Sequence, residues 1–216
     1  MRLRGITRAH LASSAIRLVV AASLMGWLSA PLEASAGPLV PTISQRSPAW
    51  AADHLGSDPH DTIGRYGCAL AAMSMVHSAF GYPTDPRQLN RWLTEHGGYI
   101  ENDLLLWRQA AADTRGGIRW RWLHVAGISP ALAVDDQDID PLPTRAMVTA
   151  ELDQGHLVVA EVRLHGGMHF VVITGHERGS LQINDPWYGD RTTLEARYGP
   201  YAQAVHSAQI YVRGGS

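Results

Sequence analysis

The sequence predicts an α+β fold in which a buried helix that begins at Cys68 packs against an antiparallel sheet. Two observations lead to this prediction. Helical patterns dominate the middle of the chain, whereas the last third changes to short apolar segments separated by glycine-containing turns. Helices first and strands afterwards are typical of the α+β class.

The central helix is expected over Ala69 to Phe80, where almost every residue is apolar or small. Ala72 and Val76 follow helical spacing, while Leu70 and Met73 cover other faces. A helix that is apolar nearly all round is buried. Cys68 therefore stands at the N-terminus of a core helix.

Three further helices are predicted. Asp85-Pro86 is a cap followed by proline at the first helical position, and Gly97-Gly98 ends that helix. A second helix is expected over Asp103 to Ala112, where Leu104 and Trp107 share a stripe. Thr144 caps a third that runs to Gln154.

The strands are predicted from alternation and turn signals. Ile118 to Val125 places two tryptophans on one side and two arginines on the other. Leu157 to Arg163, His169 to Thr174 and Leu181 to Asp185 follow as consecutive strands. Their glycine-containing connections predict an antiparallel meander.

The first 36 residues are expected to be an export signal. Several arginines precede an apolar run from Leu18 to Ala30 that is too short to span a bilayer, and Ala34-Ser35-Ala36 suits cleavage before Gly37. An uncleaved N-terminal anchor is the alternative. Residues 37–216 have the size of one compact domain, so we expect a secreted, soluble, monomeric protein.

Composition argues against several classes of partner. The formal net charge is −2 and every basic residue is arginine, with no basic stripe. Nucleic acid and anionic membrane are therefore not expected as partners. After signal cleavage no segment approaches the length of a membrane-spanning helix. Nothing in the sequence calls for a cofactor.

The single cysteine is the most informative residue. An exported chain with one thiol cannot form an internal disulfide. Most free cysteines are small buried hydrophobes, which is the plain alternative. A helix N-terminus, however, favours a negative charge, so Cys68 is placed as a nucleophile. Gly67 leaves room for a substrate, and the Cys68 N–H can bind a developing oxyanion.

His169 is the candidate base, because it opens a strand directly after Gly166-Gly167 and can stand at the rim of a sheet. If residues 175–179 form a five-residue hairpin loop, His169 lies directly opposite Asp185 on the same face. A four-residue loop over residues 177–180 instead places Tyr188 opposite His169. The sequence allows a Cys-His-Asp triad without fixing the register.

An ordered set of short motifs spans nearly the whole chain after the signal. It resembles the peptidase C-thirty-nine-like domain, a papain-like family related to the bacteriocin-processing peptidases of ABC transporters. The resemblance implies a papain-like fold, a triad of Cys68, His169 and Asp185, and an oxyanion-hole amide from Gln45. The motifs are Gln45-Arg46-Ser47-Pro48-Ala49-Trp50, Leu55-Gly56, Thr62-Ile63-Gly64, Gly67-Cys68-Ala69, Gly98-Tyr99, Gly167-Met168-His169-Phe170-Val171-Val172 and Asn184-Asp185-Pro186-Trp187.

Metal binding is the less favoured alternative. The Asp- and His-rich stretch from Asp53 to Asp61 offers ligands, with His54 and His60 also rival neighbours of the cysteine, but it lacks a recognised zinc spacing. His165 and His169 are four apart, yet the glycines between them argue against a helix. Asp135 to Asp140 lacks the central glycine and terminal glutamate of a calcium loop.

Together these features predict a secreted cysteine peptidase or amidase that hydrolyses peptide or peptidoglycan-peptide substrates through a thioacyl-enzyme intermediate. A catalytically weak pseudopeptidase that binds peptides or cell-wall fragments is the alternative. Trp50, Trp107 and Trp187 could stack on sugars, but large aromatics at such positions more often belong to the core.

Overall fold

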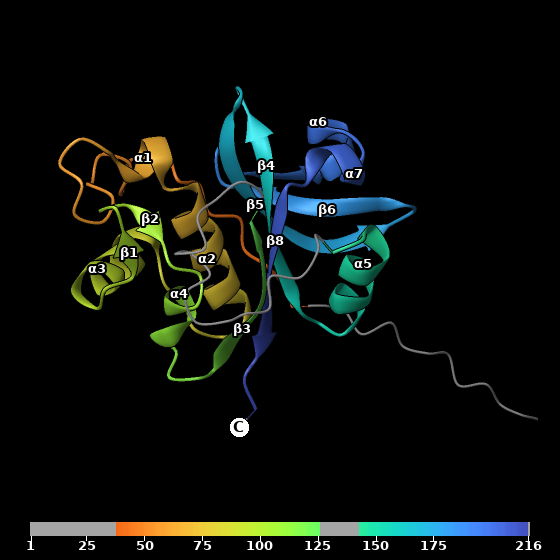
Figure 1. Ribbon diagram of the computed structural model, residues 1–216, viewed down its shortest axis with the longest axis horizontal. Coiled ribbons are helices and arrows are strands. Elements are labelled where there is room, and N and C mark those ends of the chain that lie inside the picture. Colours follow the sequence, from red (N-terminus) through yellow and green to blue (C-terminus); the bar gives the residue numbers. More distant parts are fainter. Residues whose placement is uncertain (1–37, 126–142, 216) are drawn as a thin grey trace, which may run out of the picture. The chain divides into compact units, whose positions relative to one another are not determined.

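The computed structural model describes residues 38–125 and 143–215, and its centre is a six-stranded antiparallel sheet (Figure 1). The strand order is β3-β8-β4-β5-β6-β7. The expected export signal over residues 1–36 and the acidic loop at 135–140 lie outside the described residues. The strands are β3 (Ile118–Val125), β4 (Leu157–Leu164), β5 (Gly167–Glu177), β6 (Ser180–Asp185), β7 (Asp190–Thr193) and β8 (Ser207–Arg213).

Both faces of the sheet are covered. Successive residues of β4 join two different apolar clusters, because side chains alternate along a strand. Leu157 and Val159 pack with the helices α2 (Cys68–Ala79) and α3 (Pro86–Glu95). Val158 and Ala160 pack with α5 (Arg145–Asp153), α6 (Leu194–Tyr198) and α7 (Tyr201–Ala204) on the other face (Figure 1).

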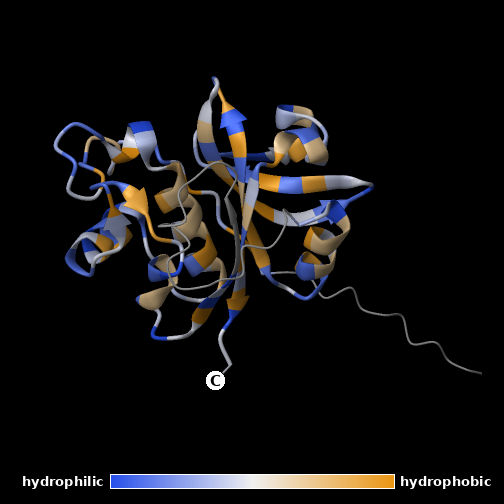
Figure 2. Ribbon diagram, in the orientation of Figure 1, coloured by the Kyte–Doolittle hydropathy of each residue, from blue (hydrophilic) through white to orange (hydrophobic). Residues whose placement is uncertain are grey.

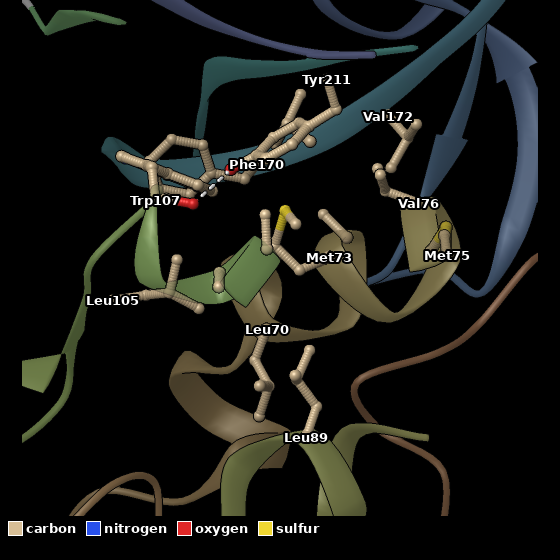
Figure 3. Packing of buried hydrophobic residues seen from close by; sticks show 14 of the residues in the cluster. Leu70, Met73, Met75, Val76, Leu89, Leu105, Trp107, Phe170, Val172 and Tyr211 are labelled. Carbon is tan, nitrogen blue, oxygen red and sulfur yellow. Dashed lines mark hydrogen bonds between the residues drawn. The ribbon is translucent and has the colours of Figure 1, made fainter. Parts of the chain in front are cut away.

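The helix that begins at Cys68 is buried as the sequence predicts. Figure 2 shows α2 neutral to hydrophobic along most of its length, and Figure 3 shows Leu70 pointing toward Leu89 of α3. On the other side of α2, the Trp107 and Phe170 rings meet edge to face, with centroids 4.8 Å apart. The Tyr211 hydroxyl donates to the Trp107 carbonyl oxygen at 3.0 Å, which satisfies a polar group inside the core (Figure 3).

The predicted helix caps are also present. Asp85 accepts the N–H of Gln88 at 2.8 Å, and proline occupies the first turn of α3. Thr144 accepts the N–H of Met147 at 3.3 Å at the start of α5. The α+β class, the Cys-led helix and the antiparallel meander β4-β5-β6 are therefore confirmed.

The helix predicted over Asp103 to Ala112 is wrong. Glu101 and Asn102 have positive φ angles of 51° and 76°, which turn the chain between β1 (Tyr99–Ile100) and β2 (Leu104–Leu105). Helix remains only in α4 (Gln109–Ala112). Leu105 of this hairpin and Trp107, two residues after it, are buried, so tertiary packing overrides the local helical pattern.

Three other features are not anticipated from the sequence. A short helix α1 (Ile63–Tyr66) directly precedes α2, and α6 and α7 follow β7. The last strand, β8, inserts between β3 and β4, so the sheet is more than a meander. In the part of the chain that the structure describes, no helix has the length and apolar character needed to cross a bilayer.

Candidate active site

A cavity of about 580 Å³ opens beside the N-terminus of α2. Cys68 and Gln45 line it from the α2 side, and the start of β5 lines it from the sheet. Its walls are mostly apolar. They include Leu55, Tyr99, Leu104, Leu105, Trp107 and Phe170.

Cys68 is held at the first position of α2 by the tight passage from α1. A Cβ atom on residue 67 would lie 2.6 Å from the Ile63 carbonyl oxygen, so only glycine fits there. Cys68 is 8% exposed, and its thiol donates to the Tyr66 carbonyl oxygen at an S···O distance of 3.8 Å. The N–H groups of a first helical turn lack intrahelical acceptors and favour negative charge.

His169 lies near the start of β5 with its side chain almost fully buried. Its Nε2 is 2.9 Å from Oδ1 of Asp185. The Cys68 side chain lies close enough to raise the pKa of the His169 ring. Because Nε2 is occupied by Asp185, Nδ1 is the ring nitrogen left for the thiol.

Next to its turn, the hairpin that joins β5 and β6 has the register of the predicted four-residue loop, with His176 opposite Leu181, but beyond Thr174, toward His169, it follows neither predicted register. Its turn is the two residues 178–179, with Glu177 opposite Ser180, and β5 contains one extra residue, Thr174. Beyond this bulge, Val172 lies opposite Asn184. His169 and Asp185 therefore meet diagonally, on the same face, and not as a directly opposite pair.

The bulge at Thr174 decides which face Asp185 occupies. If the pairing next to the turn continued regularly through Thr174, without a bulge, Asp185 would lie opposite Val172. Neighbouring residues of a strand point to opposite faces, so Asp185 would then lie on the face away from His169. The bulge at Thr174 thus keeps His169 and Asp185 on the same face of the sheet, where their side chains can form a hydrogen bond.

Asp185 accepts hydrogen bonds on both carboxylate oxygens. Besides His169, Oδ1 accepts the backbone N–H of Trp187 at 3.0 Å. Oδ2 accepts the Tyr198 hydroxyl at 2.6 Å and Nη1 of Arg197 at 3.1 Å. The side chain is fully buried. Sequence reasoning missed Arg197 and Tyr198, because they lie on a short helix without a recognisable motif.

These contacts shift the pKa values of both residues. Burial alone would raise the pKa of Asp185, but the hydrogen bonds from His169, Tyr198 and Arg197 lower it to about 2. Burial likewise would lower the pKa of His169, but its hydrogen bond with Asp185 and the nearby Cys68 side chain raise it to about 9. An ionised carboxylate beside a protonated imidazole is therefore the favoured state at neutral pH.

Gln45 reaches the cavity although more than twenty residues separate it from Cys68. Its backbone N–H donates to the Pro186 carbonyl oxygen at 2.9 Å, which ties it to the loop after Asp185. Its side-chain Nε2 donates to the Gly64 carbonyl oxygen at 3.2 Å. One N–H of that amide group thus remains available, close to the start of α2.

The other sequence candidates lie elsewhere. Among the described residues, His54 and His60 do not line the cavity, whereas Trp107 and Trp187 do. His165 stands in the β4–β5 turn with a φ of 51°, not on a helix with His169. Over residues 38–125 and 143–215, no three His, Cys, Asp or Glu side chains are grouped so that they could hold a metal ion.

Comparison with known proteins gives one family match. A family model described as the Peptidase_C39 like family matches residues 39–213. No curated protein sequence matches the chain. The fold is similar to that of a protein described as a C39-like peptidase from Bacillus anthracis, with 14% identity, a TM-score of 0.48, and coverage of 83% of this chain and 98% of that one. It is also similar to the peptidase domain of Streptococcus ComA, a bifunctional ABC transporter involved in quorum sensing, with 16% identity, a TM-score of 0.41, and coverage of 82% and 98%.

Proposed function

The chain belongs to the Peptidase_C39 like family and is a cysteine peptidase, and from this premise we propose that it is secreted and works through Cys68, His169 and Asp185. One observation carries the proposal. His169, whose ring is hydrogen-bonded to the buried Asp185 at 2.9 Å, lines the same cavity as the helix-leading Cys68. A nucleophile, a base and a group that orients the base are thus within one site.

In the proposed reaction, the thiol proton of Cys68 has already passed to Nδ1 of His169 in the resting enzyme, and the thiolate attacks the carbonyl carbon of the scissile amide. The tetrahedral intermediate collapses when the imidazolium gives its proton to the leaving amine, which breaks the C–N bond and leaves a thioester on Cys68. Water, deprotonated by His169, then hydrolyses the thioester. Asp185 keeps the imidazole oriented and stabilises its protonated form throughout.

We assign the oxyanion hole to the Cys68 N–H and the Gln45 amide. The backbone N–H belongs to the first turn of α2 and is directed out of the helix. The Gln45 amide is neutral and does not titrate, so it can donate without quenching the thiolate. Its bond to the Gly64 carbonyl oxygen supports this role, because it fixes one N–H and leaves the other.

The proposed substrate is a peptide or a peptidoglycan peptide with a large apolar side chain near the scissile bond. The cavity beside Cys68 has aliphatic and aromatic walls, including Leu105, Trp107 and Phe170. Burying an apolar side chain there contributes roughly 1.5–3 kcal/mol of binding free energy. Secretion is proposed from the arginine-led apolar segment before Gly37.

Turnover of a pooled fluorogenic peptide library by residues 37–216 tests this function. We expect hydrolysis that Cys68→Ser and His169→Ala abolish, with faster cleavage of pools that carry aromatic or leucine side chains. His176→Ala is the matched control, because His176 lies on the same strand but is exposed and pairs with Asp153. Peptide binding by the wild type without turnover would instead support the pseudopeptidase alternative.

A further inference from the structure

The second carboxylate oxygen of Asp185, Oδ2, accepts hydrogen bonds from two adjacent side chains that the proposed mechanism does not use. Tyr198 and Arg197 both donate to Oδ2, at 2.6 Å and 3.1 Å, while Oδ1 faces His169. We propose that Arg197 and Tyr198 form a clamp that fixes the rotation of the Asp185 carboxylate and so positions His169 for catalysis. The inference rests on the proposed triad and adds two positioning residues to it.

The clamp is built on a helix that is anchored to the sheet. Leu194, the first residue of α6, is fully buried in the second apolar cluster. The Glu195 carboxylate accepts the backbone N–H of Leu181 in β6 at 2.9 Å. Gly199, with a φ of 93°, ends α6 directly after Tyr198. The backbone that carries both donors is therefore fixed against the strand that carries Asp185.

Arg197 is itself held in place by two further neighbours, Asp190 and Tyr188. Its guanidinium makes two bonds to the Asp190 carboxylate, at 2.7 Å and 2.8 Å, and lies 4.3 Å from the centre of the Tyr188 ring. Asp190 pairs with Asp185 across β6 and β7. Arg197 thus bridges two carboxylates, and a planar fork with two partners is more rigid than a single contact.

The charged and titratable groups around Asp185 come from three elements. They are His169 on β5, Asp190 on β7, and Arg197 and Tyr198 on α6. Burial and the nearby Asp185 carboxylate raise the pKa of Tyr198 above its ordinary value, so the hydroxyl stays protonated and remains a donor. A carboxylate has a broad, two-fold torsion about its last bond. Donors on Oδ2 remove that freedom and keep Oδ1 directed at His169.

A double-mutant cycle read through iodoacetamide alkylation of Cys68 tests the clamp. Cys68 is the chain's single cysteine, so mass spectrometry follows one site and no substrate is needed. At pH 6 we expect Tyr198→Phe and Arg197→Gln each to slow alkylation by about threefold to tenfold. Each variant removes one charge-assisted hydrogen bond to Asp185, and only part of that lost free energy reaches Cys68 through His169. The acid limb of the rate profile should also move to higher pH. In an Asp185→Ala background, Tyr198→Phe should have no further effect.

Tyr188→Phe is the matched control, because it removes a neighbouring hydroxyl that makes no bond to Asp185, and Arg197→Lys should restore part of the rate by keeping the charge. The clamp would be refuted if Tyr198→Phe slowed alkylation equally with and without Asp185. It would also be refuted if the variants lowered the maximal alkylation rate without shifting the acid limb of the rate profile. If Arg197→Gln does not fold, Tyr198→Phe and Asp190→Asn still test the clamp. A wild-type pH profile of Cys68 alkylation in both variants would refute it. A normal profile in Asp185→Ala itself would refute the triad instead.

Discussion

Asp185→Asn is the substitution whose outcome the structure defines most closely. Four donors surround the wild-type carboxylate, namely the His169 ring, the Trp187 backbone, Arg197 and Tyr198. An asparagine has one acceptor oxygen and one NH₂ donor. If its oxygen stays toward His169, its NH₂ meets Tyr198, which can accept, and Arg197, which cannot.

The expected magnitude follows from the pKa of the buried carboxylate. The contacts lower it from 3.8 to about 2, and at about 1.4 kcal/mol for each pH unit this corresponds to roughly 2.5 kcal/mol of stabilisation. Because the folded pKa lies below the unfolded one, this contribution is present above pH 3.8 and lost as the pH falls through about 2. At pH 7, Asp185→Asn should therefore lower the free energy of unfolding by about 2–3 kcal/mol. Asp185→Ala should cost about 3–5 kcal/mol, because it leaves every donor unpaired.

Urea unfolding between pH 7 and pH 2.5, together with turnover of the peptide library, measures both effects. Asp185→Asn should keep some turnover, because an amide oxygen can still accept from the imidazole, whereas Asp185→Ala should lose more. The stability gap between wild type and Asp185→Asn should narrow toward pH 2.5. Asp153→Asn is the control, since Asp153 is exposed and pairs with His176. Equal and negligible losses in both Asp185 variants would refute this reasoning.

Three further predictions test other parts of the account. Gln45→Ala should lower turnover about a hundredfold while Cys68 alkylation stays nearly unchanged, because the donor acts on the transition state; unaffected turnover would remove Gln45 from the oxyanion hole. The pKa of His169 rises from 6.5 to about 9 on folding, so its stabilisation is complete below pH 6.5 and up to about 3 kcal/mol is lost as the pH rises through 9. Urea titrations should show that loss in wild type and not in His169→Gln. An identical dependence of the free energy of unfolding on pH in the two proteins would contradict this prediction. N-terminal sequencing of the exported protein should begin at Gly37, and an intact N-terminus would favour the anchor.

Much of the fold could be predicted because local signals agree with the tertiary structure. A few neighbouring residues are enough to predict each of three helices. These signals are the all-apolar pattern of α2, the Asp85-Pro86 start of α3 and the Thr144 cap of α5. The segment after Gly98 misleads, because Leu104 and Trp107 have helical spacing, whereas residues 104 and 105 form a strand and the core buries Leu105 and Trp107. Their burial depends on partners far along the chain, which no local pattern contains.

In the candidate site, too, some residues could be predicted from the local sequence, whereas others depend on the tertiary structure. Cys68 and His169 could be singled out from their neighbours in sequence, but the path that joins His169 to Asp185 depends on one extra residue at Thr174. A bulge has no reliable sequence signal, and a one-residue change in register reverses every side chain beyond it. Arg197 and Tyr198 reach Asp185 only because α6 folds back on β6.

The pairing of Cys68 with His169 is the central claim, and the pH dependence of Cys68 alkylation tests it most directly. The assay compares wild type with His169→Ala over pH 4 to 9, with His176→Ala as the control on the same strand. At pH 6 only about 0.3% of an ordinary thiol is ionised, so a thiol without a partner reacts slowly there. The account predicts that wild type and His176→Ala are alkylated at pH 6 at least about tenfold faster than His169→Ala. Superimposable profiles for wild type and His169→Ala, both rising near pH 8.5, would contradict it.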